Sequence, residues 1–187
     1  MIPGALVNLR AVERHDVPRI HRWLTDPAVM HGWGWSSPVR SLYDVARQVE
    51  SWLEGESTTT FPAALVAESL AGDPVGLVIL RSQRLEARSV DLSLLVDAAC
   101  WGQGFGADIL QTVLDACFDG WGVHRIGIQV EAGNTRALAL YRRYGFREEG
   151  RLREAAFRDG QHTDILLHAL LAAEWRVIGD CPAPPGS

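Results

Sequence analysis

The hydrophobic and polar positions along the chain change their period several times, and each period predicts an element. Apolar alternation near the start favours a strand over Leu6–Val12. Helical spacing then follows Asp16, which is expected to cap a helix with Pro18 in its first turn. A second helix is predicted over Ser41–Leu53, because its apolar positions recur every three or four residues and should face the core. These positions are Leu42, Val45, Ala46, Val49, Trp52 and Leu53.

The middle of the chain has the period of strands. Three strands are predicted, over Phe61–Glu68, Val75–Arg84 and Ser89–Val96. The turn at Ala71–Pro74 joins the first two, since its glycine supplies a positive φ and its proline a fixed one. We expect the three strands to pair antiparallel.

Helices and strands alternate in the second half. A helix is predicted over Gly106–Phe118, then a strand over Arg125–Glu131. A short helix over Ala137–Tyr144 follows, with Asn134 as its N-cap. Two closing strands are predicted over Phe146–Arg153 and Thr163–Leu171.

This order of elements predicts a mixed α/β fold, in which helices flank one sheet of about seven strands. The chain has 187 residues, of which 47% are hydrophobic and 22% charged, as expected for a soluble domain with one core. We assign residues 1–175 to that single domain. Residues 176–187 are rich in proline and are expected to form a disordered tail.

Charge and cysteine content narrow the possible functions. The net charge of −5 argues against a broad basic surface for nucleic acid. The three cysteines are irregularly spaced, which favours reduced thiols over a disulfide or zinc framework, with a catalytic Cys100 as an alternative. The sequence has no uninterrupted apolar stretch of about 18 residues. We therefore expect a cytoplasmic protein without a membrane partner.

Three glycines lie in the turn Trp101–Ala107, between a predicted strand and a predicted helix. Glycine lets an anion approach the backbone, and the N–H groups of a first helical turn carry partial positive charge. The spacing lacks the third glycine of a dinucleotide fingerprint and the Gly-Lys of a Walker loop. The turn therefore predicts a different phosphate site, with a simple connecting turn as the alternative.

A loop rich in glycine and tryptophan is predicted over Met30–Pro38. Trp33 and Trp35 either form one wall of a ligand pocket or cap the core beneath the loop. His31, in the same loop, is assigned a structural role.

Two motifs together resemble the GNAT superfamily of acetyl-CoA-dependent N-acetyltransferases. The family signature Gln/Arg-x-x-Gly-x-Gly/Ala matches the glycines of Trp101–Gly106. Tryptophan in its first position is similar to the RimJ/RimL-type branch. The block Asn-x-x-Ala-x-x-x-Tyr-x-x-x-Gly-Phe matches the chain from Asn134 through Tyr141 to Phe146. The resemblance covers roughly residues 5 to 175.

The resemblance implies how acetyl-CoA binds. A central strand and its parallel neighbour would splay apart and bond the pantetheine arm along Leu94–Val96, while the pyrophosphate would lie on the amides of Gly102–Ala107. It implies no metal, a proton donor to the CoA thiolate in Tyr141, and an orienting role toward pantetheine for Asn134. The implied cofactor-binding residues are Leu94, Leu95, Val96, Gly102, Gln103, Gly104, Phe105, Gly106, Ala107, Asn134 and Tyr141.

The sequence leaves the general base open. Some relatives carry a glutamate five residues before the asparagine, where this chain has Gln129, and an amide cannot take the proton. Glu131 shares a strand face with Gln129, and Asp91 lies on the preceding strand, so either is a candidate, directly or through water. Both also fit solvated carboxylates at strand ends. A CoA-binding sensor without turnover is therefore an alternative.

Two acceptors are considered. The RimJ/RimL-type resemblance implies the N-terminal amine of a protein or peptide, bound over Trp33 and Trp35. The alternative is a small amine such as a polyamine or an aminoglycoside, which suits the acidic balance and would be favoured by carboxylates in the cleft. A homodimer is also expected, because the late strands and seven tryptophans leave apolar surface.

Overall fold

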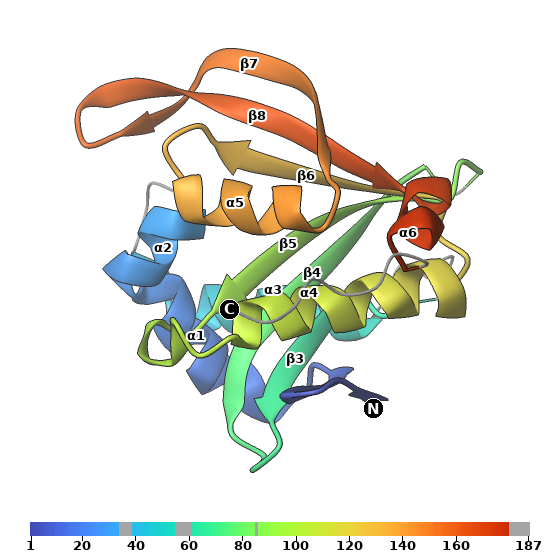
Figure 1. Cartoon of the computed structure of the whole chain (residues 1–187). Helices are drawn as coiled ribbons and strands as arrows, with labels where there is room; N and C mark the ends of the chain where they lie inside the picture. The colour runs from blue at the N-terminus through green and yellow to red at the C-terminus, as the bar shows by residue number, and fades with distance from the viewer. Residues whose placement is uncertain (34–38, 55–60, 85, 180–187) are drawn as a thin grey trace.

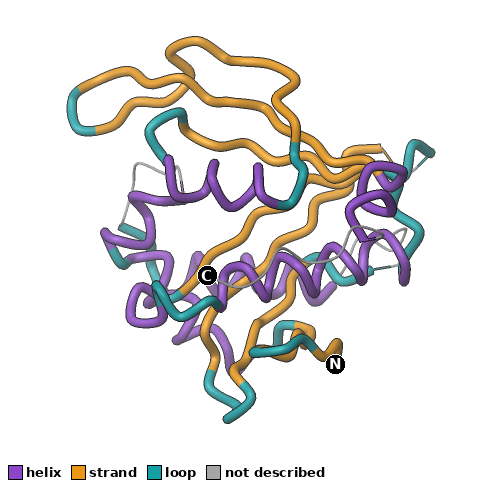
Figure 2. The backbone as a smooth tube through the Cα atoms, viewed as in Figure 1, coloured by secondary structure: helices purple, strands orange, loops and turns teal. Residues whose placement is uncertain are grey.

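One sheet with helices on both faces makes up the fold (Figures 1 and 2). This computed structural model describes residues 1–33, 39–54, 61–84 and 86–179. The strands are β1 (Ile2–Pro3), β2 (Val7–Ala11), β3 (Ala64–Ser69), β4 (Pro74–Arg84), β5 (Ser89–Val96), β6 (Arg125–Glu131), β7 (Arg147–Arg158) and β8 (Gln161–Leu171). They lie in the order β1-β2-β3-β4-β5-β6-β8-β7, and β5 and β6 form the one parallel pair among these described strands. The predicted mixed α/β fold is confirmed.

Each face of the sheet has its own hydrophobic cluster and its own helices. One face is covered by α1 (Val17–Thr25), α2 (Pro27–Trp33) and α3 (Leu42–Glu54), and the other by α4 (Phe105–Asp115), α5 (Thr135–Arg143) and α6 (Ala172–Gly179). The predicted stripe on α4 is confirmed, since its side chains are fully buried on the second face. They are Ile109, Leu110, Val113, Leu114 and, just after the helix, Cys117.

Strand β4 lies between the two hydrophobic clusters and contributes side chains to both. Leu77 and Ile79 belong to the cluster under α1–α3, whereas Val78 and Leu80 belong to the cluster under α4–α6. A strand buried on both faces reads as a continuous apolar run, which is how this segment appears in the sequence. Each such side chain contributes about 1.5–3 kcal/mol on burial.

Helix α2 differs from the expected loop. The residues from Met30 to Trp33 belong to this helix, and Met30 is buried in the core. The missed signal is Asp26-Pro27, an N-cap residue followed by proline at the first helical position. The Asp26 carboxylate accepts a hydrogen bond from the Ala28 N–H at 2.8 Å. Residues 34–38, including Trp35, lie outside the described residues.

Some side chains also depart from the predicted pattern. Leu42 and Leu53 were expected in the core but are 51% and 38% exposed, because α3 turns Val45 and Val49 toward the core, with Trp52 packed beside them. Asp16 precedes α1 without capping it, since its carboxylate pairs with Arg10 and accepts from the Glu13 N–H. Helix positions near an end therefore follow tertiary contacts more than periodicity.

The C-terminal helix α6 was not predicted. Trp175 anchors it in the core, within 6.0 Å of Phe118 between ring centroids. The helix continues to Gly179, so residues 176–179, which were assigned to the expected tail, are helical. None of the described helices is long and apolar enough to cross a membrane.

The parallel strands β5 and β6 separate along their length. They pair only at Ser89–Arg125, Val90–Ile126 and Asp91–Gly127, although β5 continues to Val96 and β6 to Glu131. In Figure 1 the two arrows start together at the right and diverge to the left, with α5 beside the opening. The splay that the family resemblance implied is therefore present.

Candidate active site

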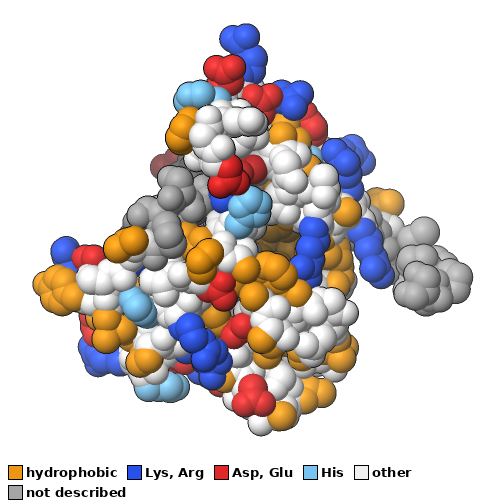
Figure 3. Space-filling view, turned by 90° about the vertical axis from the view of Figure 1, so that its left-hand side faces the viewer, with side chains coloured by type: hydrophobic (Ala, Val, Ile, Leu, Met, Phe, Trp, Pro, Cys, Tyr) orange, Lys and Arg blue, Asp and Glu red, His pale blue; other side chains and the backbone are white. Residues whose placement is uncertain are grey.

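A cavity of about 910 Å³ opens where β5 and β6 separate. Seen from the left-hand side of Figure 1, the surface is hollowed near its centre and has acidic, histidine and arginine side chains around the hollow (Figure 3). The cavity extends through the sheet, because Leu92 and Val130 on its wall belong to the α4–α6 face while Val29 and Leu95 belong to the α1–α3 face. Its volume suits a large ligand that reaches both faces.

The glycine-rich turn forms the α4 side of the cavity. Gly102 and Gly104 have φ values of 79° and 86°, which only glycine adopts at low cost, and Gly104 is the N-cap of α4. In the described structure the five amides from Gly102 to Gly106 donate no hydrogen bond within the protein. Five free N–H groups at a helix N-terminus can bind a pyrophosphate.

Two residues of the predicted phosphate site behave differently. The Ala107 amide already donates to the Gly104 carbonyl at 3.1 Å, although the residue lines the cavity. The Gln103 side chain points to the Ala99 carbonyl at 3.1 Å and does not line the cavity. The backbone of Gln103 therefore remains in the predicted site, while its side chain leaves it.

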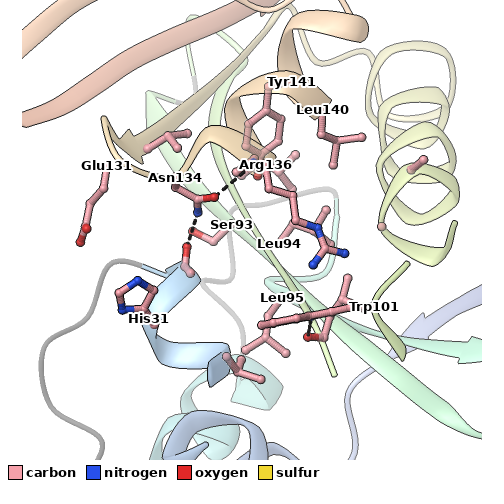
Figure 4. A pocket seen from close by; sticks show the side chains of 18 of the residues that line it. His31, Ser93, Leu94, Leu95, Trp101, Glu131, Asn134, Arg136, Leu140 and Tyr141 are labelled. Atoms are coloured by element: carbon pink, nitrogen blue, oxygen red, sulfur yellow. Dashed lines mark hydrogen bonds between the residues drawn. The ribbon is translucent and has the colours of Figure 1, made fainter. Parts of the chain in front are cut away.

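Trp101 and Arg136 close the cavity beside this turn (Figure 4). The Trp101 indole N–H donates to the Val96 carbonyl at 2.9 Å. The Arg136 guanidinium carbon lies 4.9 Å from the Trp101 ring centroid, a cation–π contact. Sequence reasoning missed Arg136. The available signal was a cation in the first turn of a helix, where the helix dipole disfavours it.

Tyr141 lines the cavity from α5. Its side chain is buried, its ring lies 5.4 Å from that of Phe146, and its hydroxyl makes no hydrogen bond with any described residue. Burial raises the pKa of Tyr141 to about 12, so the hydroxyl is protonated at neutral pH. A phenol with this pKa gives up its proton only as negative charge develops on an atom within hydrogen-bonding distance.

Asn134 caps α5 as predicted and makes a second contact. Its side-chain oxygen accepts from the Ala137 N–H at 3.1 Å, and its side-chain nitrogen donates to the Gly32 carbonyl at 2.6 Å (Figure 4). Gly32 and His31, in the last turn of α2, line the same cavity. His31, expected to be structural, therefore lies at the site.

Glu131 is held by an arginine from β7. Arg158 donates to both of its carboxylate oxygens, at 2.8 and 2.6 Å, and the two side chains are only 16% and 11% exposed. Arg158 also lies 3.5 Å from the Nδ1 atom of His31. Because both oxygens of Glu131 are engaged by a cation, a substrate proton has to compete with Arg158 for them.

Asp91 lies where the strands part. It lines the main cavity together with Ser93 and Gln129, and it also lines a neighbouring cavity of about 430 Å³. Its carboxylate packs against Gly127 of β6. Asp91 thus lies at the junction of the two cavities.

Two other predicted groups contribute less. Cys100 lines the cavity, but burial and the nearby Asp97 carboxylate raise the pKa of its thiol, which disfavours the reactive thiolate. The backbone of Trp33 ends α2, while its side chain lies outside the described residues. Among the residues that the structure describes, no group of three or more His, Cys, Asp or Glu side chains could hold a metal ion.

A splayed parallel strand pair, a glycine-rich turn at a helix N-terminus and a cavity joining them define the class of acetyl-CoA-dependent N-acetyltransferases. A model of the acetyltransferase (GNAT) domain matches residues 7–147, and the chain belongs to this family. Acetyl-CoA is its co-substrate.

The chain is similar to several acetyltransferases, as this class predicts. A spermidine N(1)-acetyltransferase of Vibrio cholerae is 27% identical over 90% of this chain and 95% of its own length. An aminoglycoside N(6')-acetyltransferase of Klebsiella pneumoniae is 28% identical over 77% of this chain and 75% of its own length. The solved structure of the Vibrio cholerae spermidine N-acetyltransferase with CoA and spermine has a TM-score of 0.83 at 26% identity, covering 92% of this chain and 99% of that one. These relatives do not confirm the RimJ/RimL-type branch.

Proposed function

We propose that the protein transfers the acetyl group of acetyl-CoA to a primary amine of a small cationic molecule, of the polyamine or aminoglycoside type. The observation that carries this proposal is the cavity through the splayed sheet, which is lined by the glycine-rich turn and by the carboxylates Asp91 and Glu131. Carboxylates attract a cationic amine, and the net charge of −5 adds to that attraction. The similarity to spermidine and aminoglycoside acetyltransferases supports this acceptor over a protein N-terminus.

The reaction requires a proton acceptor, hydrogen-bond donors for the oxyanion and a proton donor from the protein. The amine has to lose a proton before or during attack on the thioester, and Asp91 is the carboxylate at the strand junction that can take it, directly or through water. Beyond Asp91, backbone N–H groups on the edge of β5 that no longer pairs with β6 can stabilise the oxyanion. Tyr141 can then protonate the departing thiolate, since its hydroxyl is protonated and lines the cavity.

Self-association is proposed as well. β7 is an edge strand of the sheet, and Leu152 and Phe157 on it are 44% and 56% exposed. Apolar side chains on an uncovered edge favour pairing with another copy. A similar protein, the Vibrio cholerae spermidine N-acetyltransferase, has been solved as a dodecamer. A monomeric mass by light scattering at micromolar concentration would remove this proposal.

The acceptor class is tested by following thiol release from acetyl-CoA with a matched panel of amines. The panel contains spermidine, an aminoglycoside, a peptide with a free N-terminus and the same peptide acetylated. We expect the highest kcat/KM with a small polycation. Turnover of the free peptide alone would overturn the acceptor assignment. Binding of acetyl-CoA without thiol release for any amine would instead support a sensor module.

A further inference from the structure

The side chain of Asn134 attaches the last turn of α2 to the start of α5. Asn134 donates to the Gly32 carbonyl at 2.6 Å and accepts from the Ala137 N–H at 3.1 Å. The Ala137 contact fixes the orientation of the amide, since an N–H must face its oxygen and the nitrogen must then face Gly32. The Gly32 contact joins residues that are 102 positions apart in the sequence.

A second contact reaches the same turn from the same region. Arg158 lies 3.5 Å from His31, the residue before Gly32, and is itself held by Glu131. The Glu131 carbonyl accepts from the Asn134 N–H at 2.9 Å. The two attachments of α2 are therefore linked, because Glu131 at the end of β6 holds Arg158 through its carboxylate and Asn134 through its carbonyl.

Helix α2 needs such support. It has seven residues, and a helix of this length is not stable in isolation. The carbonyls of its last turn have no partner within the helix, and Asn134 satisfies that of Gly32. Val29 and Met30 fix the buried side of α2, so the Asn134 contact determines where its end lies at the cavity.

We propose that Asn134 is a positioning residue for the acceptor side of the cavity, and this proposal rests on the proposed acetyl transfer to an amine. Its carboxamide joins α5, which carries Tyr141, to α2, which carries His31 and Gly32. The position of α2, which lines the acceptor side of the cavity, therefore depends on α5. This role differs from the orienting of pantetheine, because it uses the hydrogen bonds that the two polar atoms of the side chain make within the protein.

Three substitutions separate the helix cap from the attachment. Asn134→Ser keeps an N-cap oxygen but removes the N–H donor. Asn134→Asp keeps the size and the cap but sets a carboxylate oxygen against the Gly32 carbonyl. Asn134→Ala removes both functions. Ser41→Ala is the matched control, since Ser41 caps α3 through the Asp44 N–H at 3.0 Å and does not line the cavity.

Two measurements decide the proposal. For Asn134→Ser and Asn134→Asp, the acceptor KM should rise about tenfold while the acetyl-CoA Kd stays within about twofold of the parent. Amide exchange in residues 27–33 should become faster in both variants and stay unchanged in Ser41→Ala. A weaker acetyl-CoA affinity with an unchanged acceptor KM would overturn the proposal in favour of pantetheine binding.

The exchange measurement needs no acceptor. If the parent protein acetylated no amine, the proposed function would fail, while faster exchange in α2 would still establish the attachment. Unchanged exchange in all three Asn134 variants would overturn the attachment, whatever the activity. The failures of the two proposals are therefore distinguishable.

Discussion

The carboxylate of Asp91 occupies the space that a side chain on Gly127 would fill. A Cβ atom built on Gly127 would lie 2.7 Å from the Asp91 Oδ1 atom, closer than real contacts allow. Asp91 and Gly127 are also the last paired residues of β5 and β6 before the strands separate. A glycine at this point of β6 therefore lets a carboxylate lie at the apex of the splay.

Gly127→Ala should displace the Asp91 carboxylate without removing it. We expect kcat/KM for the amine to fall by about 10²-fold, the size of the effect of a misplaced reacting group. The acetyl-CoA affinity should stay near that of the parent. Gly133→Ala is the control, because a Cβ there meets nothing within 4 Å. Equal activity of the two variants would show that the position of Asp91 does not matter.

The two candidate bases can be separated by amide substitutions. Asp91→Asn should lower turnover by about 10²- to 10⁴-fold, because the amide cannot take a proton. Glu131→Gln should lower the unfolding temperature instead, since Arg158 would lose its charged partner in a site where the pair is mostly buried. Stopped-flow acetyl transfer and thermal unfolding measure the two effects. The reverse outcome would assign the base to Glu131.

Tyr141→Phe should remove the proton donor and keep the packing. Single-turnover acetylation should slow by about 10²- to 10⁴-fold, while the acetyl-CoA affinity changes little. Acetylation at the parent rate across the pH range would make Tyr141 a packing residue.

The same substitution has a signature in stability. The pKa of Tyr141 is raised from 10.0 to about 12 by burial, so the folded state holds this proton more tightly than the unfolded chain. The resulting stabilisation is complete below pH 10 and is lost as pH rises toward 12. Tyr141→Phe should therefore flatten the fall in unfolding free energy over this window, as measured by denaturant titration at each pH.

Gly104→Val should weaken acetyl-CoA binding by at least about tenfold, or about 1.4 kcal/mol. Valine is strained at the φ of 86° and would alter the backbone that presents the free amides. Gly72→Val is the control for strain alone, since Gly72 has a φ of 89° in the β3–β4 turn. Calorimetry with both folded variants decides the matter. An unchanged affinity in Gly104→Val would rule out the turn as the phosphate site.

Arg136→Gln should raise the Kd for acetyl-CoA by about tenfold, because a guanidinium beside the glycine-rich turn can bond a phosphate oxygen. The loss should shrink at high salt, where charge is screened. Arg142→Gln, in the last turn of the same helix, is the control and should bind as the parent does. If both variants lost affinity equally, net charge would explain the effect.

Local patterns predicted most of the fold. The bounds of β6 are those expected, and Asn134 caps α5, because each feature depends on residues close in sequence. Helix α2 was not predicted, because the glycines and tryptophans after Met30 indicated a loop and the Asp26-Pro27 start signal was outweighed.

Long-range pairs in the site could not be predicted in the same way. Glu131 and Arg158 meet because β8 lies between β6 and β7 and because the β7–β8 register shifts between Leu152 and Ala156. A one-residue change in register turns a side chain to the other face, so no spacing in the sequence fixes this pair. Asn134 and Gly32 likewise meet only once both faces of the sheet are packed.

The splay between β5 and β6 also links the unfolding free energy of the protein to its co-substrate. Beyond Asp91 and Gly127 each of these strands has an edge without its sheet neighbour, and a ligand that bonds to such an edge completes the folded state. A molecule that binds only the folded form raises the unfolding free energy by about 2.7 kcal/mol at one hundred times its Kd. Resistance to unfolding, and to proteolysis through the unfolded state, is therefore expected to rise with the concentration of acetyl-CoA.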